Sequence, residues 1–243
     1  MAKVSELDLI STDFLSDCAD SDSMFLRVVS YAKKLGFDFA AFGMQMPFPL
    51  NSPKIVAKNN YGSDWWNIYQ KNNYFTIDPV VKHVLASDDA VVWSNTFFSS
   101  APEFWESARQ HGLRFGWTKG MRDDSGTISQ LSFARTEDAI SESELLEKEV
   151  YMRHLAEIAH LKMASILVAE QFPESLTQLT TKELEAIRWC ADGKTNVETA
   201  LILGVSTSAI NFHINNVLKK LGASNKAHAV MKASRFGLLG RPG

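Results

Sequence analysis

The sequence from Leu179 to Val230 reads LTTKELEAIRWCADGKTNVETALILGVSTSAINFHINNVLKKLGASNKAHAV. Residues whose side chains can accept a hydrogen bond from the first turn of a helix recur four times in it, at Thr180, Thr195, Ser206 and Asn225. Both threonines are followed three residues later by a glutamate, the pattern of a capping box. The stretch therefore predicts an all-α module of four short helices.

Glycines and apolar residues complete this pattern. A glycine, which readily adopts the left-handed conformation that ends many helices, closes each predicted helix, at Gly193, Gly204, Gly222 and Gly237. Between the caps, apolar residues recur at helical spacing, which places them on one face of each helix. These residues are Leu184, Ile187 and Ala191, then Ala200, Leu201 and Leu203, then Ile210, Ile214, Val217, Leu218 and Leu221, and finally Ala229, Val230 and Ala233. We expect them to form one small hydrophobic core.

The second and third predicted helices are separated by a tight turn at Gly204, which is the helix-turn-helix arrangement. In that arrangement the second helix of the pair lies in the major groove of DNA. The third predicted helix, from Thr207 to Leu221, would then contact bases and phosphates with its polar face. The expected DNA-contacting residues on it are Thr207, Ser208, Asn211, Asn215, Asn216, Lys219 and Lys220. The solvated face of any amphipathic helix has a similar composition, so the cluster counts for more than each single residue.

The charge of the chain is divided unevenly. Residues 179–243 hold nine Lys or Arg and four Asp or Glu, a formal net charge of +5. Because the whole chain of 243 residues carries −3, the rest carries −8. A basic module attached to a larger acidic part is expected of a phosphate-binding unit joined to a separate sensor.

This module resembles the LuxR-type helix-turn-helix. The segments LTTKELEAIRWCADGKT and INFHINNVLKKLGASNKAHAV carry the resemblance. It implies that the scaffold positions are Glu183, Ile187 and Gly193. It also implies that Lys194 and Thr195 lie near the DNA backbone, and that the stretch from Ile210 to Lys220 enters the groove.

Ser208 and Ala209 depart from the family pattern, which more often has Arg-Thr at these positions. The departure removes a base or phosphate contact, so the resemblance does not imply a particular operator sequence. One short helix reads few base pairs, whereas two half-sites raise both affinity and specificity. We therefore expect a homodimer bound to a double-stranded DNA operator.

Residues 1–170 have the pattern of a mixed α/β domain. The predicted strands are Phe37–Met44, Lys54–Asn59, Gly116–Met121 and Thr127–Arg135, the last two joined by the turn Arg122-Asp123-Asp124-Ser125-Gly126. One predicted helix ends at Gly36, and others cover Trp65–Asn72, Asp78–Leu85, Pro102–His111 and Ser143–Ala169. Adjacent strands with a short turn indicate an antiparallel sheet, which the helices would sandwich. A phosphorylated receiver domain, with parallel strands and alternating helices, is not indicated.

The middle of this domain is rich in aromatic residues, with Asp78 among them. Trp65 and Tyr69 are four residues apart and so share one helix face, and Tyr61 lies just before that helix. An indole only donates a hydrogen bond, a phenol donates or accepts, and a carboxylate accepts. A small ligand with an amide N–H, two carbonyl groups and an alkyl tail would satisfy these groups and bury its tail among the rings.

This part resembles the autoinducer-binding domain of LuxR-type regulators, whose ligands are N-acyl-homoserine lactones. The family spacing is met by Trp65, Tyr69, Asp78-Pro79 and Trp93, and Gly116 falls at a pocket or scaffold position. The resemblance implies that Trp65 donates to the lactone carbonyl and that Asp78 accepts from the amide N–H. It implies that Tyr61 and Ser132 bind the acyl carbonyl. The pocket wall would consist of Tyr69, Trp93, Phe104 and Trp105.

Ordinary structural explanations exist for the same residues. Asp78-Pro79 is a favourable helix start, and Trp65 and Tyr69 taken alone suit a hydrophobic core. Gln130 would be an unusual pocket residue, and it leaves the length and C3 substitution of an acyl chain open. A pyrone, a resorcinol or another small amphiphile would suit the same aromatic residues.

A catalytic role is not indicated by the sequence. A lactone hydrolase would need a nucleophile or a metal, and no such constellation accompanies Asp78 and Trp65. Cys18 and Cys190 lie far apart and lack a companion His or Cys at metal-binding spacing. We therefore expect inert thiols, no metal, no cofactor and no enzymatic activity.

The expected domains are residues 1–170 for ligand binding, 171–178 for a linker and 179–243 for DNA binding. A long apolar stripe, Tyr151, Leu155, Ile158, Leu161, Ala164 and Val168, suits packing against the sheet or against a second subunit. No apolar run approaches the ~20 residues of a membrane span. The start MAKVSELDLI lacks the order of a signal peptide. We expect a cytoplasmic protein without a membrane partner.

Overall fold

The computed structural model describes residues 18, 20–123 and 126–240. The chain divides into two compact units, one ending at Leu167 and the other beginning at Val168. Within the turn predicted at residues 122–126, Asp124 and Ser125 lie outside the described residues.

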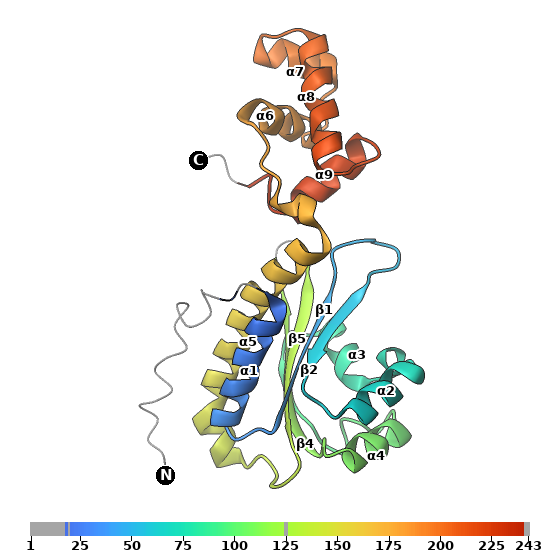
Figure 1. Ribbon diagram of the computed structural model, residues 1–243, viewed down its shortest axis with the longest axis vertical. Coiled ribbons are helices and arrows are strands. Elements are labelled where there is room, and N and C mark those ends of the chain that lie inside the picture. Colours follow the sequence, from blue (N-terminus) through green and yellow to red (C-terminus); the bar gives the residue numbers. More distant parts are fainter. Residues whose placement is uncertain (1–17, 19, 124–125, 241–243) are drawn as a thin grey trace. The chain divides into compact units, whose positions relative to one another are not determined.

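The N-terminal unit is built on a five-stranded antiparallel sheet (Figure 1). The strands are β1 (Phe39–Gln45), β2 (Ile55–Asn59), β3 (Ala90–Val92), β4 (Phe115–Arg122) and β5 (Ile128–Arg135), hydrogen-bonded in the order β2-β1-β5-β4-β3. The four predicted strands are confirmed with small shifts at their ends. The edge strand β3 was not predicted, because three residues are too few to show an alternating pattern.

Helices cover both faces of the sheet, as predicted (Figure 1). On one face lie α1 (Ser21–Lys34) and the long α5 (Glu142–Gln171). On the other lie α2 (Ser63–Lys71), the short 3-10 helix η3 (Tyr74–Thr76), α3 (Pro79–Ala86) and α4 (Pro102–Gln110). The fold is therefore the predicted α/β sandwich.

The register between β1 and β5 determines which residues face α2, α3 and α4. Ala41 lies opposite Ser132, and Gly43 lies opposite Gln130. Successive side chains of a strand point to opposite faces, so these four residues share one face of the sheet. Because the residues of β1 are small there, space is left between the sheet and the helices.

The opposite face of the sheet packs against α1 and α5. The Phe133 ring lies 5.4 Å from the Phe37 ring and 5.9 Å from the Trp117 ring, between ring centroids. All three side chains are at most 2% exposed. This aromatic layer is the part of the core that α1 and α5 cover.

Only part of the apolar stripe predicted along α5 is buried. Leu155, Ile158 and Ala164 are buried, whereas Leu161 is 65% exposed. The buried face also contains Met152, Ala156, Ala159, His160, Met163 and Leu167. The prediction left open whether the stripe packs against the sheet or against a second subunit, and the buried part packs within the N-terminal unit. α5 has apolar residues on several sides, and their spacing alone does not reveal which side a neighbour covers.

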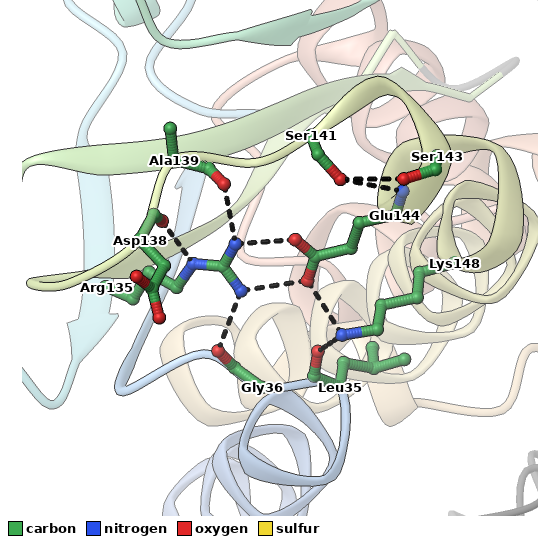
Figure 2. Close-up of polar contacts among 9 residues, drawn as sticks. All are labelled: Leu35, Gly36, Arg135, Asp138, Ala139, Ser141, Ser143, Glu144 and Lys148. Atoms are coloured by element: carbon green, nitrogen blue, oxygen red, sulfur yellow. Dashed lines mark hydrogen bonds and ion pairs between the residues drawn. The ribbon is translucent and has the colours of Figure 1, made fainter. Parts of the chain in front are cut away.

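The guanidinium group of Arg135 connects the end of β5 to the start of α5 through hydrogen bonds (Figure 2). Arg135, the last residue of β5, donates to both carboxylate oxygens of Glu144, at 2.8 and 2.6 Å. It also donates to the carbonyl oxygens of Gly36, Asp138 and Ala139. Lys148, one turn after Glu144, donates to the same carboxylate and to the carbonyl oxygen of Leu35. This network, here called the Arg135 network, joins the ends of α1 and β5 to α5.

The C-terminal unit contains the four predicted helices. They are α6 (Thr181–Ala191), α7 (Asn196–Leu203), α8 (Thr207–Lys220) and α9 (Lys226–Arg235), preceded by the 3-10 helix η4 (Pro173–Leu176). All four predicted caps are confirmed, and Thr180 with Glu183 and Thr195 with Glu198 form reciprocal capping boxes.

The predicted core of this unit is largely confirmed. Its fully buried members are Ala186, Ile187, Ala200, Ile210, Ile214, Val217, Leu221, Ala229 and Ala233. The assignment of Leu201 to this core was wrong, because its side chain is 78% exposed. Ala200 and Leu203 are three residues apart and share one face of α7, whereas Leu201 lies about 100° further around the helix.

We expect Glu144→Gln to lower the free energy of unfolding at neutral pH by about 1–3 kcal/mol, because it removes charge-assisted hydrogen bonds from the Arg135 network. Hydrogen bonding to Arg135 lowers the pKa of Glu144 from 4.5 to about 2. A lowered carboxyl pKa stabilises the fold above pH 4.5 and loses that contribution as the pH falls toward 2. Denaturant unfolding of both proteins at neutral and acid pH should therefore show a difference that shrinks on acidification.

The matched control is Glu149→Gln, which breaks the more exposed pair of Glu149 with Arg153 on the same helix. That pair should contribute less than about 0.5 kcal/mol. Equal effects of the two substitutions, or a Glu144→Gln effect that does not change with pH, would contradict the role of the network.

Candidate functional site: a buried cavity and a helix-turn-helix surface

One cavity of the N-terminal unit lies between the sheet and helices α2, α3 and α4. It contains about 620 Å³ of space not filled by protein atoms, part of it open to solvent. The eight residues expected to bind a ligand all line it: Tyr61, Trp65, Tyr69, Asp78, Trp93, Phe104, Trp105 and Ser132. The structure thus brings together residues that the sequence places far apart.

Asp78 is the only residue with a carboxyl group among the described residues that line this cavity. Its side chain caps α3 by accepting from the Val80 amide at 2.8 Å, and its second oxygen accepts from the Tyr69 hydroxyl at 2.8 Å. Burial raises the pKa of Asp78 to about 6, and these two hydrogen bonds oppose the rise. A carboxylate has about four lone-pair sites, so Asp78 can cap the helix and still accept a further hydrogen bond.

The two cavity tyrosines are both neutral at physiological pH. Burial raises the pKa of Tyr61 and of Tyr69 above the ordinary tyrosine value, and the nearby Asp78 charge adds to the effect. The Tyr69 hydroxyl donates its hydrogen bond to Asp78. Tyr61 keeps a hydroxyl that can donate or accept toward the cavity.

The cavity indoles differ in whether the protein already uses their N–H group. Trp93 donates to the Thr118 hydroxyl at 2.9 Å, and that hydroxyl lies 2.8 Å from the hydroxyl of Ser132. Trp105 donates to the Asn95 side chain at 2.8 Å. Trp65 is 2% exposed and has no hydrogen-bond partner among the described residues. The Trp65 N–H is therefore a donor available to a ligand. The N–H groups of Trp93 and Trp105 are already bonded within the protein, so these two residues contribute only their rings to the cavity wall.

Aromatic packing fixes the orientation of Trp65. Its ring lies 5.4–5.9 Å, between centroids, from the rings of Tyr69, Tyr74, Phe104 and His111. Rings packed at such distances attract one another beyond the burial of their area. The donor is consequently held in place before any ligand arrives.

Trp93 reaches the cavity across a glycine of β4. A Cβ atom at Gly116 would overlap the Trp93 indole and would come within 2.8 Å of the Phe133 carbonyl oxygen. Only glycine leaves room for this indole, which accounts physically for the scaffold role predicted for Gly116.

Sequence reasoning missed many residues that line the cavity. They are Ala41, Phe42, Gly43, Ala57, Asn59, Trp66, Phe75, Val80, Phe98, Ala108 and Leu113. Gln130, anticipated as an unusual pocket residue, also lines it. Strand alternation from Ser132 could have placed Gln130 on this face, but Ala41 and Gly43 required the pairing of β1 with β5, which the sequence does not reveal.

A serine and a histidine meet on the other face of the sheet. The Ser129 hydroxyl and His160 Nδ1 are 2.7 Å apart, and His160 Nε2 lies 3.6 Å from a carboxylate oxygen of Asp123. The residue types are those of a catalytic triad, but Ser129 is 2% exposed and lies against α5. The contact joins β5 to α5.

The second candidate site is the outer surface of α8. A bend of 113° separates α7 from α8, in the range of helix-turn-helix pairs. Ser208, Asn211, Asn215 and Lys219 are exposed, while Thr207, Asn216 and Lys220 are half-buried. In the described part of the chain no single helix is long and apolar enough to cross a bilayer, and α7 and α8 reach that length only together, across their bend.

Lys220 has a partner inside the module. Its ammonium group lies 2.7 Å from the carboxylate of Glu183 and 3.2 Å from the carbonyl oxygen of Gln178. The Glu183 side chain is 4% exposed, and the bond from Lys220 lowers its pKa against the opposing effect of burial. Lys220 therefore holds α8 to the capping box of α6, and its predicted phosphate contact would compete with this bond.

Asn211 is also tied to its neighbours. Its side-chain oxygen accepts from the Asn196 amide, and the Asn196 oxygen accepts from Lys226 at 2.7 Å. Sequence reasoning missed Asn196 and Lys226, which lie at the starts of α7 and α9. Lys194 and Thr195, expected near the DNA backbone, are exposed at the end of the loop before α7.

These two sites define the class of protein: one unit has a partly open cavity with few polar groups, and the other has a basic helix-turn-helix surface. Residues 20–163 match the family described as "Autoinducer binding domain", and residues 177–233 match "Bacterial regulatory proteins, luxR family". The chain belongs to the LuxR family of autoinducer-binding transcriptional regulators of quorum sensing. The resemblance predicted from the sequence is confirmed.

Known relatives are similar along almost the whole chain. The transcriptional activator protein AnoR of Acinetobacter nosocomialis is 39% identical over 222 residues, which cover 90% of this chain and 93% of that protein. The quorum-sensing regulator RhlR of Pseudomonas aeruginosa is 34% identical and covers 90% and 91%. The structure of SdiA in complex with octanoyl-rac-glycerol has a TM-score of 0.78 at 28% identity, covering 98% of this chain and 97% of that one.

We expect Tyr69→Phe to raise the pKa of Asp78 by about one unit above 6, because the lost hydrogen bond favours the ionised carboxyl group. The measurement is a ¹³C NMR titration of the aspartate carboxyl groups in the full chain. Tyr74→Phe is the control, because the Tyr74 ring packs against Tyr69 and Trp65 but its hydroxyl does not bond to the Asp78 carboxylate. The Tyr74 backbone carbonyl, which accepts from the Asp78 N–H, is kept in this variant. An unchanged Asp78 titration in Tyr69→Phe would refute the assigned coupling.

We expect Lys219→Ala and Lys220→Ala to have different effects. Lys219→Ala should weaken binding to a mixed-sequence duplex and reduce the slope of log affinity against log salt by about one. Lys220→Ala should instead destabilise the unit by about 1–3 kcal/mol, because Glu183 loses its partner. Fluorescence anisotropy at several salt concentrations and thermal unfolding separate the two effects. An unchanged salt slope in Lys219→Ala would contradict the assignment of α8 to the phosphate-binding surface.

Proposed function

We propose that the cavity binds an N-acyl-homoserine lactone and that the chain, as a homodimer in the bacterial cytoplasm, binds an operator on double-stranded DNA. The observation that carries the proposal is the pair of Trp65 and Asp78. Trp65 offers an N–H without a protein partner, and Asp78 offers a buried carboxylate. The rest of the lining is mostly aromatic and aliphatic.

This polarity matches the lactone group by group. Trp65 donates to the lactone carbonyl, and Asp78 accepts from the amide N–H. Tyr61 and Ser132 bind the acyl carbonyl, for which each has a hydroxyl group at the cavity. The acyl chain packs against the wall residues Tyr69, Trp93, Phe104 and Trp105.

The same arrangement gives ligand binding a pH dependence. The ionised form of Asp78 accepts the amide N–H more strongly than the neutral acid does. Because the Asp78 pKa is about 6 in this cavity, lactone affinity falls as the pH decreases below that value. Binding in turn lowers the pKa of Asp78, since the new donor favours the carboxylate.

Exposed residues of α5 support the dimer. Leu146, Val150 and Leu161 are 81%, 63% and 65% exposed. Their spacings of four and eleven residues place them on one side of the helix. A second copy of the chain would bury this side. A filled cavity stabilises the folded N-terminal unit by mass action, which raises the concentration of dimer able to bind two half-sites.

No chemical step is part of the proposal. The known relatives are transcriptional regulators, and Asp78 bonded to Tyr69 and Val80 is arranged to accept hydrogen bonds. A different small amphiphile is the second candidate ligand. It is favoured by the SdiA structure, whose bound octanoyl-rac-glycerol has an acyl chain but no lactone.

The test is to express the full chain in cells supplied with acyl-homoserine lactones of several chain lengths, purify it and identify bound molecules by mass spectrometry. We expect one intact lactone per chain. Asp78→Asn should reduce retention at least about ten-fold, because a buried charge-assisted hydrogen bond is worth roughly 1.5–3 kcal/mol. Trp65→Phe should reduce it several-fold for loss of the free N–H.

Trp105→Phe is the matched control, because its N–H already bonds to Asn95, and it should retain more lactone than Trp65→Phe. Equal retention by wild type and Asp78→Asn would reject the assigned pocket. A hydrolysed product would indicate an enzyme, and a retained acylglycerol with no lactone would favour the second candidate.

A further inference from the structure

A second cavity adjoins the first on the same face of the sheet. It encloses about 420 Å³ of empty space and shares three lining residues with the first cavity: Gly43, Phe75 and Gln130. Its other lining residues include Met44, Ile55, Val84, Leu85 and Ile128. The two cavities are therefore neighbours, divided by the shared residues.

Gln130 is the polar residue among the three that line both cavities. It lies two residues before Ser132 on β5, about 7 Å away along the strand, and on the same face. Its side chain covers Gly43, since a Cβ atom there would lie 3.3 Å from the Gln130 Cγ. An alanine in place of Gly43 would require the glutamine side chain to shift by a few tenths of an ångström.

The amide of Gln130 has no hydrogen-bond partner among the described residues, although the residue is half-buried between two apolar spaces. An amide group in such surroundings is costly unless something bonds to it. Asp78, Trp65 and Tyr61, by contrast, line the first cavity and not the second. An oxygen atom partway along the ligand would satisfy the Gln130 N–H groups.

The far end of the second cavity is apolar and partly open. Ile55 on β2 and Leu85 on α3 both line it, and they are 41% and 48% exposed. An alkyl chain that leaves the first cavity past Gln130 would cover both of them.

We propose, building on the lactone-binding function above, that Gln130 selects the ligand. Its amide hydrogen-bonds to a 3-oxo or 3-hydroxy group of the acyl chain, and the second cavity binds the end of a long chain. The preferred ligand is therefore a C3-oxygenated acyl-homoserine lactone whose chain extends beyond the first cavity. Shorter chains still place C3 beside Gln130, but they end before the second cavity and leave it unused.

The test is a competition inside cells that express the full chain. The medium contains equal amounts of hexanoyl-, 3-oxohexanoyl-, dodecanoyl-, 3-oxododecanoyl- and 3-hydroxydodecanoyl-homoserine lactone. Retained ligands are quantified by mass spectrometry. Ratios within one sample do not depend on how much protein folds, so weakly expressed variants remain informative.

For wild type we expect each C3-oxygenated dodecanoyl lactone to exceed dodecanoyl lactone by about three- to ten-fold, the effect of one net hydrogen bond. Gln130→Leu, which keeps the size but removes the amide, should abolish that preference and leave the preference for long chains. Leu85→Glu should lower the dodecanoyl to hexanoyl ratio by at least about four-fold, the value of one buried methylene group. Leu26→Glu, at an exposed leucine of α1 on the other face of the sheet, should leave both ratios unchanged.

Two results would overturn the inference while leaving lactone binding intact. One is an equal preference for C3-oxygenated ligands in wild type and Gln130→Leu. The other is an unchanged chain-length ratio in Leu85→Glu. Retention of no lactone by wild type would instead reject the proposed function on which the inference depends.

Discussion

Burying one carboxyl group among aromatic rings is the constraint on which the N-terminal unit depends. Asp78 is 7% exposed, and such a group is tolerated only where hydrogen bonds replace the lost water. One bond comes from the start of α3 and the other from Tyr69 on α2, so satisfying Asp78 joins α2 to the start of α3. The remaining bonding capacity points into the cavity. The same requirement therefore organises the fold and produces the polar end of the ligand site.

Charged groups act in a similar way elsewhere in the chain. The Arg135 network joins three elements at backbone carbonyl groups that apolar contacts could not satisfy, and Lys220 joins α8 to the nearly buried Glu183 of α6. Apolar packing is non-directional, whereas these bonds have defined partners and distances. Such bonds specify how elements meet, even where they add little net stability. In α8 the consequence is functional, because only part of its basic face is left for DNA.

Much of the fold and of the cavity could be predicted from the sequence, because the signals are local. The four caps follow from Thr180, Thr195, Ser206 and Asn225, and the spacing of Trp65, Tyr69 and Asp78 encodes one wall of the cavity. The errors concern partners distant in sequence. Leu201 is exposed because nothing in the described chain covers it, and helical periodicity does not show which side of a helix has a neighbour. The ion pair of Lys220 with Glu183, and the place of Gln130 beside Gly43, depend on tertiary contacts that no local pattern contains.

The two units are connected along the chain by α5, so any influence of a ligand on DNA binding within one chain would pass through this helix. The boundary between the units falls within α5, which begins at the Arg135 network and runs as one helix to Gln171. The segment that follows is bonded to the C-terminal unit, since Glu174 in η4 lies 2.8 Å from Lys232 of α9. A ligand shifts an equilibrium only by its difference in affinity between two states. α5 packs on the sheet whose opposite face lines the cavity, and it also presents Leu146, Val150 and Leu161 to solvent. In the proposed dimer, whose formation would bury these residues, filling the cavity would act on both units through α5.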